Sequence, residues 1–122
     1  MKKRIALSTE KKTEALSAWL HEHKALQLVS LHVDSAWTEA LIIVSATSVR
    51  HARSLADGLL AWCKEQKLEF LSMEGYQAGQ WILVDLNDVI VNIFQTQTRE
   101  LYRLESLWAA SPEPPSPQET PA

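Results

Sequence analysis

The sequence predicts a single α+β domain built on one mixed β-sheet of about five strands with flanking helices. Its 122 residues fall within the usual range for one domain, and a hydrophobic share of 46% is ordinary for a chain that buries a core. Apolar residues recur at helical spacing in some segments and at strand-like spacing in others. Along the chain the order is α-β-β-α-β-β-β-α, which favours one sheet covered by helices.

The first half of the chain predicts helix, strand, strand and helix. Residues 9–23 form an amphipathic helix if the apolar stripe is Ala15, Leu16, Trp19 and Leu20. Residues 29–33 alternate apolar and polar side chains, as in a strand with one solvated face. Residues 41–44 are apolar throughout, which indicates a central strand covered on both faces. Ser48 is a candidate N-cap for the longest helix, whose stripe is Ala52, Leu55, Ala56, Leu59, Trp62 and Cys63.

The second half predicts three short strands and a closing helix. The strands are expected over residues 68–73, 80–85 and 88–94, and Gly75 and Gly79 bracket the first connection. The closing helix carries the apolar residues Leu101, Leu104, Leu107 and Trp108, with Tyr102 at the margin of that stripe. We therefore expect the domain to span residues 1–110.

The last residues have a different composition. All five prolines of the chain fall between residues 112 and 121, among Ser, Glu, Gln and Thr. Such a segment cannot bury enough apolar surface to order itself. We expect a disordered proline-rich tail over residues 111–122.

Charge and cysteine content exclude several classes of protein. A net charge of -3 argues against binding to nucleic acid mainly through phosphate contacts. Cys63 is the only cysteine, so the fold depends on no intrachain disulfide, and a reducing compartment is expected. The basic start is followed by too short an apolar run for a signal peptide, and no segment is long enough to span a membrane. These features predict a soluble cytoplasmic protein.

A hairpin near Asn87 separates two faces of the predicted sheet. Asn87 adopts positive φ more readily than most residues, so a two-residue loop at Leu86-Asn87 would pair Asp85 with Asp88 and Trp81 with Asn92. One face is then entirely aliphatic and faces the core. The other face mixes an aromatic residue, aliphatic residues and carboxylates, a composition typical of protein-binding patches: Trp81, Leu83, Asp85, Asp88, Ile90 and Asn92.

Two other outcomes remain open for this second face. Trp81 could pack under a helix with its indole N–H bonded locally, which is common for a Trp in a strand. A register slip of one residue would exchange the two faces and remove the argument for a binding surface.

Several segments, taken in order, resemble the ribosomal silencing factors, also called the Iojap family. They are Ser45-Ala46-Thr47-Ser48-Val49-Arg50-His51, Met73-Glu74-Gly75, Trp81-Ile82-Leu83-Val84-Asp85, Asp88-Val89-Ile90-Val91, and residues 99–108, which read Arg-Glu-Leu-Tyr-Arg-Leu-Glu-Ser-Leu-Trp. The resemblance covers about residues 8–108. It implies a nucleotidyltransferase-like fold, without enzyme activity and without a cofactor.

The resemblance also implies a partner. The family binds ribosomal protein number fourteen of the large ribosomal subunit, blocks joining of the small subunit and lowers translation in starved cells. Trp81 and Tyr102 match family positions within that contact, and Glu74, Asp85 and Arg99 lie at neighbouring motif positions. Asn92 stands where the family usually has His and is expected to alter the contact. We expect no membrane partner, no sequence-specific nucleic acid, and a monomer or weak homodimer.

Enzymatic interpretations are less well supported. A nucleotidyltransferase needs a Gly-Ser turn and two carboxylates spaced two apart on a strand to hold Mg²⁺. Here Ser45-Ala46-Thr47-Ser48 lacks the glycine, and Asp85 and Asp88 straddle a turn. A residual nucleotide-binding enzyme that uses Asp85, Asp88 and Glu74 remains the alternative. Cys63 lies on an apolar helical stripe and is expected to be an inert core thiol.

Overall fold

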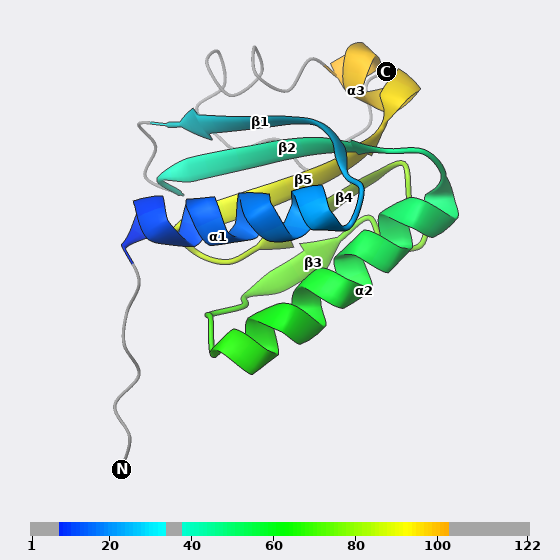
Figure 1. The fold of residues 1–122 in the computed structure, drawn as a ribbon. Coiled ribbons are helices and arrows are strands. Elements are labelled where there is room, and N and C mark those ends of the chain that lie inside the picture. Colours follow the sequence, from blue (N-terminus) through cyan, green and yellow to red (C-terminus); the bar gives the residue numbers. More distant parts are fainter. Residues whose placement is uncertain (1–7, 34–37, 103–122) are drawn as a thin grey trace.

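The computed structural model describes residues 8–33 and 38–102, and these residues form one five-stranded sheet with three helices (Figure 1). The element order confirms the predicted α-β-β-α-β-β-β-α pattern. The elements are α1 (Thr9–Glu22), β1 (Leu26–His32), β2 (Ala40–Ala46), α2 (Val49–Gln66), β3 (Ser72–Glu74), β4 (Trp81–Asp85), β5 (Val89–Gln95) and α3 (Thr96–Tyr102). Among the described helices, none is both long and apolar enough to cross a membrane.

The sheet is mixed, with strand order β1-β2-β5-β4-β3. β2 and β5 run parallel, whereas the other three neighbouring pairs are antiparallel. Every residue of β2 is buried, as the continuous apolar run over residues 41–44 predicts. β2 therefore lies inside the sheet between β1 and β5, and the edges are left to β1 and the short β3.

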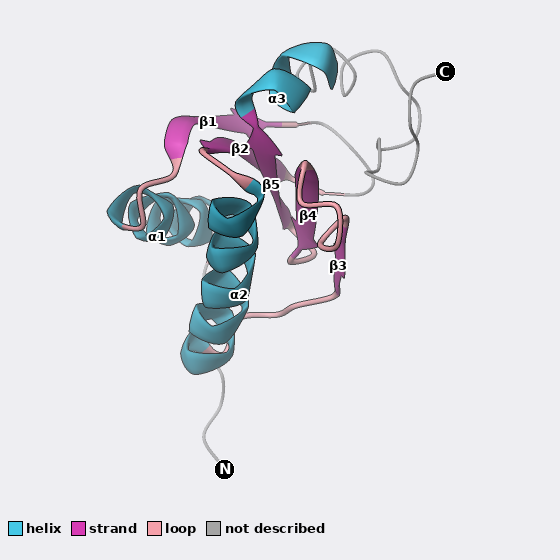
Figure 2. Cartoon of the chain, turned by 90° about the vertical axis from the view of Figure 1, so that its right-hand side faces the viewer, coloured by secondary structure: helices cyan, strands magenta, loops and turns pink. Residues whose placement is uncertain are grey.

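The two long helices lie on the same side of the sheet, here called the helical face (Figure 2). Leu16 and Leu20 from α1 and Leu55 and Leu59 from α2 are almost fully buried there. They pack on the aliphatic side chains that the sequence assigns to the core: Ile82, Val84, Val89, Val91 and Ile93. The face prediction for β4 and β5 is thus confirmed, because the apolar alternation of both strands selects one side.

The opposite side of the sheet is here called the distal face. It carries two smaller apolar clusters, one of Ile43, Trp81 and Phe94 and one of Leu41, Leu83 and Ile90. Leu31 of β1 packs against both clusters, so the apolar surface extends across four strands of the sheet.

The predicted register of the β4–β5 hairpin is wrong. Trp81 lies opposite Phe94, and Asn92 lies opposite Leu83. The tight turn is one residue further along than expected, because the Leu86 N–H donates to the Val89 carbonyl at 2.9 Å and Asn87-Asp88 close the loop. Asn87 has the positive φ of 81° that the sequence predicts. Moving a turn by one residue shifts the pairing by two, so every side chain keeps its face.

The first of the three late strands is much shorter than predicted. The sequence favours a strand over residues 68–73, but β3 contains only Ser72–Glu74. It is an edge strand that pairs with β4 alone, and it begins at Ser72 because Ser72 lies opposite Asp85, the last residue of β4. Phe70 and Leu71, which the pattern assigns to the strand, are 38% and 52% exposed in the preceding connection.

Capping residues begin both long helices as their side-chain chemistry predicts. Ser48 Oγ accepts the His51 N–H at 3.0 Å, which confirms the predicted N-cap of α2, and Ser8 does the same for Lys11 in α1. α3 is described as far as Tyr102. The predicted positions of Leu104, Leu107 and Trp108 in the closing helix, the domain end at residue 110 and the tail over 111–122 lie outside the described residues.

Candidate partner-binding surface

The distal face brings together four of the six predicted site residues from three neighbouring strands. Residues directly opposite one another in a sheet share a face, and Glu74, Leu83, Asn92 and Ile43 follow one another across β3, β4, β5 and β2. Trp81 and Asp85 flank Leu83 on β4 and point to the same side. Glu74 and Asp85 are half-buried at the β3 side of this surface.

Trp81 is not exposed, contrary to the sequence interpretation of it as an outward aromatic anchor. Only 4% of Trp81 is accessible to solvent, and its ring stacks on Phe94 with centroids 4.9 Å apart and planes at 22°. The incorrect register hid this contact, because it placed Asn92 and not Phe94 opposite Trp81. Trp81 is therefore a buried member of the distal-face clusters.

Asn92 forms the polar centre of this surface. The indole Nε1–H of Trp81 donates to Oδ1 of Asn92 at 2.9 Å, so the two residues are neighbours although they are not directly paired. Asn92 is fully buried, and its amide nitrogen has no hydrogen-bond partner. A buried donor without an acceptor is uncommon in folded proteins because it loses its bonds to water without replacement.

Asp85 and Asp88 do not act as a pair. Oδ1 of Asp85 accepts the Asn87 N–H at 2.9 Å within the turn. Asp88 instead accepts from Lys12 Nζ at 2.5 Å and from Thr9 Oγ1 at 2.9 Å, both from α1. Within the described residues no cluster of three or more His, Cys, Asp or Glu side chains suits a metal ion.

The environment of Asp88 explains its charge state. Burial alone would raise the pKa of this carboxyl, but hydrogen bonds from Lys12 and Thr9 outweigh burial and hold the pKa below its ordinary value of 3.8. Asp88 is therefore an ionised carboxylate that ties the β4–β5 turn to α1. These contacts give Asp88 a structural role. Of the two carboxylates, Asp85 is the one that lies on the distal face.

Arg99 and Tyr102 belong to α3, beyond the end of β5. Nη1 of Arg99 donates to the Gln27 carbonyl at 2.7 Å and to Ser45 Oγ at 3.0 Å, so this side chain holds α3 against β1 and β2. Gln27 has positive φ, at 51°, within the irregular part of β1. Tyr102 is the last residue of α3, and its side chain lies outside the described part of the chain.

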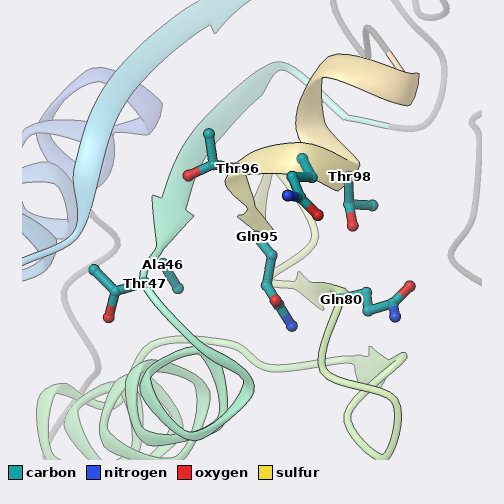
Figure 3. Close-up of a pocket in the computed structure, with 7 residues that line it drawn as sticks. Ala46, Thr47, Gln80, Gln95, Thr96 and Thr98 are labelled. Carbon is teal, nitrogen blue, oxygen red and sulfur yellow. The ribbon is translucent and has the colours of Figure 1, made fainter.

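A polar pocket of about 490 Å³ opens where the parallel strands β2 and β5 end (Figure 3). The described residues that line it are all neutral: Ala46, Thr47, Gln80, Gln95, Thr96, Gln97 and Thr98. Ligands of sheets with parallel strands bind at such carboxyl ends, so this is where the alternative enzymatic interpretation would place a nucleotide. Within the described part of the chain, this lining includes no carboxylate to hold Mg²⁺ and no cation to meet a phosphate.

Sequence reasoning missed two residues that shape this surface. Phe94 was assigned to a strand, but nothing in a linear pattern indicates which aromatic residue it stacks on. The sequence interpretation did not single out Lys12, which is only 7% exposed because its ammonium reaches Asp88, 76 residues away. Long charged side chains commonly bury their stems in this way, so the polarity of a residue alone does not reveal it.

Comparison with known proteins places the chain in a family. The profile described as "Ribosomal silencing factor during starvation" matches residues 6–122. "Ribosomal silencing factor RsfS" of Haemophilus influenzae is 43% identical over 75 residues, which cover 62% of this chain and 74% of that protein. The protein of the same name from Halalkalibacterium halodurans is 33% identical over 93 residues, covering 75% and 80%.

A solved structure supports the fold independently. A crystal structure of a Chromobacterium violaceum protein superimposes with a TM-score of 0.80, at 22% identity, over 93% of this chain and 100% of that one. The same five-stranded mixed sheet and flanking helices are therefore found in an experimentally determined structure. The profile match over nearly the whole sequence and the similarity to the two bacterial relatives show that this chain belongs to the ribosomal silencing factor family.

Proposed function

We propose that the protein binds the large ribosomal subunit through ribosomal protein number fourteen and sterically prevents the small subunit from joining. Translation is thereby repressed when nutrients are scarce. The action is non-catalytic, needs no cofactor and takes place in the cytoplasm. Family membership supports the ribosomal role, and the contact residues we propose are Trp81, Tyr102, Asp85, Asn92, Glu74 and Arg99.

The observation that carries the proposal is membership of the ribosomal silencing factor family. On the distal face Trp81 and Asn92 are buried, so the part of this face that is open to a partner is the pair of half-buried carboxylates Glu74 and Asp85 at its β3 side. α1 and α2 pack on the helical face, so a partner on the distal face would leave the main core intact (Figure 2).

Co-sedimentation with purified large subunits tests this proposal. The wild-type protein at micromolar concentration is expected in the subunit fraction, and its absence from that fraction would contradict the proposal. Glu74→Gln and Asp85→Asn remove rim charges while keeping side-chain shape, and each is expected to weaken binding by a few-fold. Glu65→Gln is the matched control, because Glu65 is an exposed carboxylate on α2, which packs on the helical face.

A residual nucleotide-binding enzyme receives less support. Asp88 is engaged by Lys12 and Thr9, so it does not join Asp85 in a metal site. Calorimetric titration with Mg²⁺ and nucleoside triphosphates separates the two functions. The proposed function predicts no heat of binding beyond dilution, whereas stoichiometric binding would favour the enzyme.

A further inference from the structure

Phe70 and Leu71 form an exposed apolar pair, here called the Phe70–Leu71 patch, in the connection between α2 and β3. Their surfaces are 38% and 52% accessible to solvent. Both ends of this short segment are held by hydrogen bonds. The Leu71 N–H donates to the Asp85 carbonyl at 2.8 Å, and Nδ2 of Asn87 donates to Oε1 of Glu69 at 3.1 Å. An apolar pair that is held in water in this way is a candidate for an interaction site.

Carboxylates flank the patch. Glu69 is exposed beside it, and Glu74 and Asp85 are half-buried at the adjoining edge of the sheet. Along residues 67–74 the only cation is Lys67. The patch therefore favours an occupant that is both apolar and positively charged. It disfavours nucleic acid, an anionic membrane and the identical patch of a second copy, because each of these brings like charges together.

The basic start of the chain has the matching composition. Residues 2–7, here called the N-terminal segment, read Lys-Lys-Arg-Ile-Ala-Leu, so three cations are followed by three apolar residues. In a chain with a net charge of -3, this is a local excess of positive charge next to hydrocarbon side chains. Both properties that the patch requires are thus present in one segment of the same chain.

The N-terminal segment is attached at the same end of the sheet as the patch. Oγ1 of Thr9 donates to Oδ2 of Asp88 at 2.9 Å, which places the start of α1 on the turn between β4 and β5. In that turn Asn87 bonds to Glu69, and Figure 1 shows the start of α1 and the connection into β3 on the same side of the molecule. Residues 1–8 span about 26 Å when extended. The segment is therefore long enough to reach the patch.

We propose that the N-terminal segment docks on the Phe70–Leu71 patch of its own chain. Ile5 and Leu7 cover the exposed apolar pair, and the cations at positions 2–4 lie near the three carboxylates. Burial of apolar surface favours the contact, and the opposite charges select this segment as the occupant. Because the segment is tethered at Thr9, its effective concentration at the patch is high, so weak contacts suffice. The inference does not depend on the proposed function, because segment and patch both belong to this chain.

Nuclear magnetic resonance on the full-length, isotope-labelled chain tests the docking directly. We expect nuclear Overhauser contacts from the methyl groups of Ile5 and Leu7 to the ring of Phe70 and the methyl groups of Leu71. Absence of these contacts would overturn the proposal. Contacts of the same methyl groups with Leu31, which lines a hollow beside the start of α1, would place the segment elsewhere and overturn it equally.

Removal of charge tests why the segment binds at this place. The triple variant Lys2→Gln, Lys3→Gln and Arg4→Gln should weaken the contacts about threefold or more, and added salt should weaken them in the wild type. Glu69→Gln should weaken them by a smaller factor. Glu14→Gln is the matched control, because Glu14 is an exposed carboxylate in the hollow beside α1, and it should leave the contacts unchanged. Contacts that persist in full in the triple variant would contradict the proposal.

Removal of the apolar surface tests the other half of the proposal. Phe70→Ser keeps every charge and removes the ring that the segment covers, so the resonances of Ile5 and Leu7 should shift. Leu26→Ser, at another exposed apolar residue, should leave them in place. Equal shifts in the two variants, or none in either, would show that the ring is not covered.

A mixture of labelled and unlabelled chains identifies which copy supplies the segment. Docking within one chain gives contacts inside the labelled chains only. Contacts between labelled and unlabelled chains mean that a second copy supplies the segment, and the proposal is then wrong.

Discussion

Trp81 and Phe94 lie opposite each other in the β4–β5 ladder, with ring centroids 4.9 Å apart. Phe94 is fully buried and Trp81 nearly so, and Ile43 and Leu31 pack against the pair. The aromatic pair is therefore part of the folded core on the distal face. It links the stability of the sheet to the surface that we propose for docking.

Replacement of Trp81 by alanine should lower the free energy of unfolding by about 3–5 kcal/mol, because it leaves a cavity beside Phe94. Trp81→Phe should cost about 1–3 kcal/mol, since Oδ1 of Asn92 loses its donor in a buried site. Urea denaturation measures both losses. An unchanged urea midpoint for Trp81→Ala would show that the indole is exposed in solution, as the sequence alone suggested.

Lys12→Met should destabilise the protein by about 1–3 kcal/mol at neutral pH, because Asp88 keeps its charge in a partly buried site without the ammonium. The pKa of Asp88 is lowered in the folded state, so its stabilising effect is present above about pH 4 and is lost as the pH falls through that lowered pKa. The difference between variant and wild type should therefore shrink in acid. Lys11→Met, at an exposed lysine of the same helix, should change little; a loss as large as that of Lys12→Met would contradict the account.

Gly79→Ala should destabilise the protein by about 1–3 kcal/mol for two reasons. Gly79 has a φ of 71°, and a methyl group there would lie 2.5 Å from Cγ1 of Val49 at the start of α2. Adding Val49→Ala should recover the steric part of the loss and leave the backbone part. Thermal unfolding of the single and double variants separates them, with the exposed residue change Ala78→Ser as control; full recovery by Val49→Ala would rule out the backbone contribution.

Cys63 should resist thiol reagents in the folded protein. Burial raises the pKa of its thiol from 9.0 to about 11, although the nearby Lys12 charge opposes the shift. Because the folded pKa is raised, this contribution to stability is complete below about pH 9 and is lost as the pH rises towards about 11. Iodoacetamide should label Cys63 only after unfolding, and Cys63→Ala should lose less stability than wild type over that alkaline range. Rapid labelling under native conditions would contradict the burial of Cys63.

Local sequence signals predicted much of the fold because they act over a few residues. In each case the signal lies in the residue itself. The hydroxyl of Ser48 caps α2, Asn87 tolerates positive φ, and the apolar side chains of residues 41–44 favour burial on both faces of the sheet. The face assignment of β4 and β5 also survived an incorrect register, since a shift of two residues preserves the alternation.

The errors concern contacts between residues that are distant in sequence. Whether Trp81 is exposed depends on Phe94 across the ladder, and whether Lys12 is solvated depends on a carboxylate 76 residues away. The start of β3 is set by the last residue of β4, Asp85, which pairs with Ser72, and not by the apolar residues that precede Ser72. The unpaired amide of Asn92 likewise becomes visible only when its neighbours are in place.

Subunit joining in the presence of the protein tests the central claim most directly. Purified large subunits are incubated with the protein, small subunits are added, and the fraction of associated ribosomes is measured on a sucrose gradient. The account predicts that wild-type protein lowers this fraction in proportion to the large subunits it occupies, and that Asp85→Asn does so only at higher concentration. Large subunits that carry bound protein and still join small subunits to the same extent would contradict it.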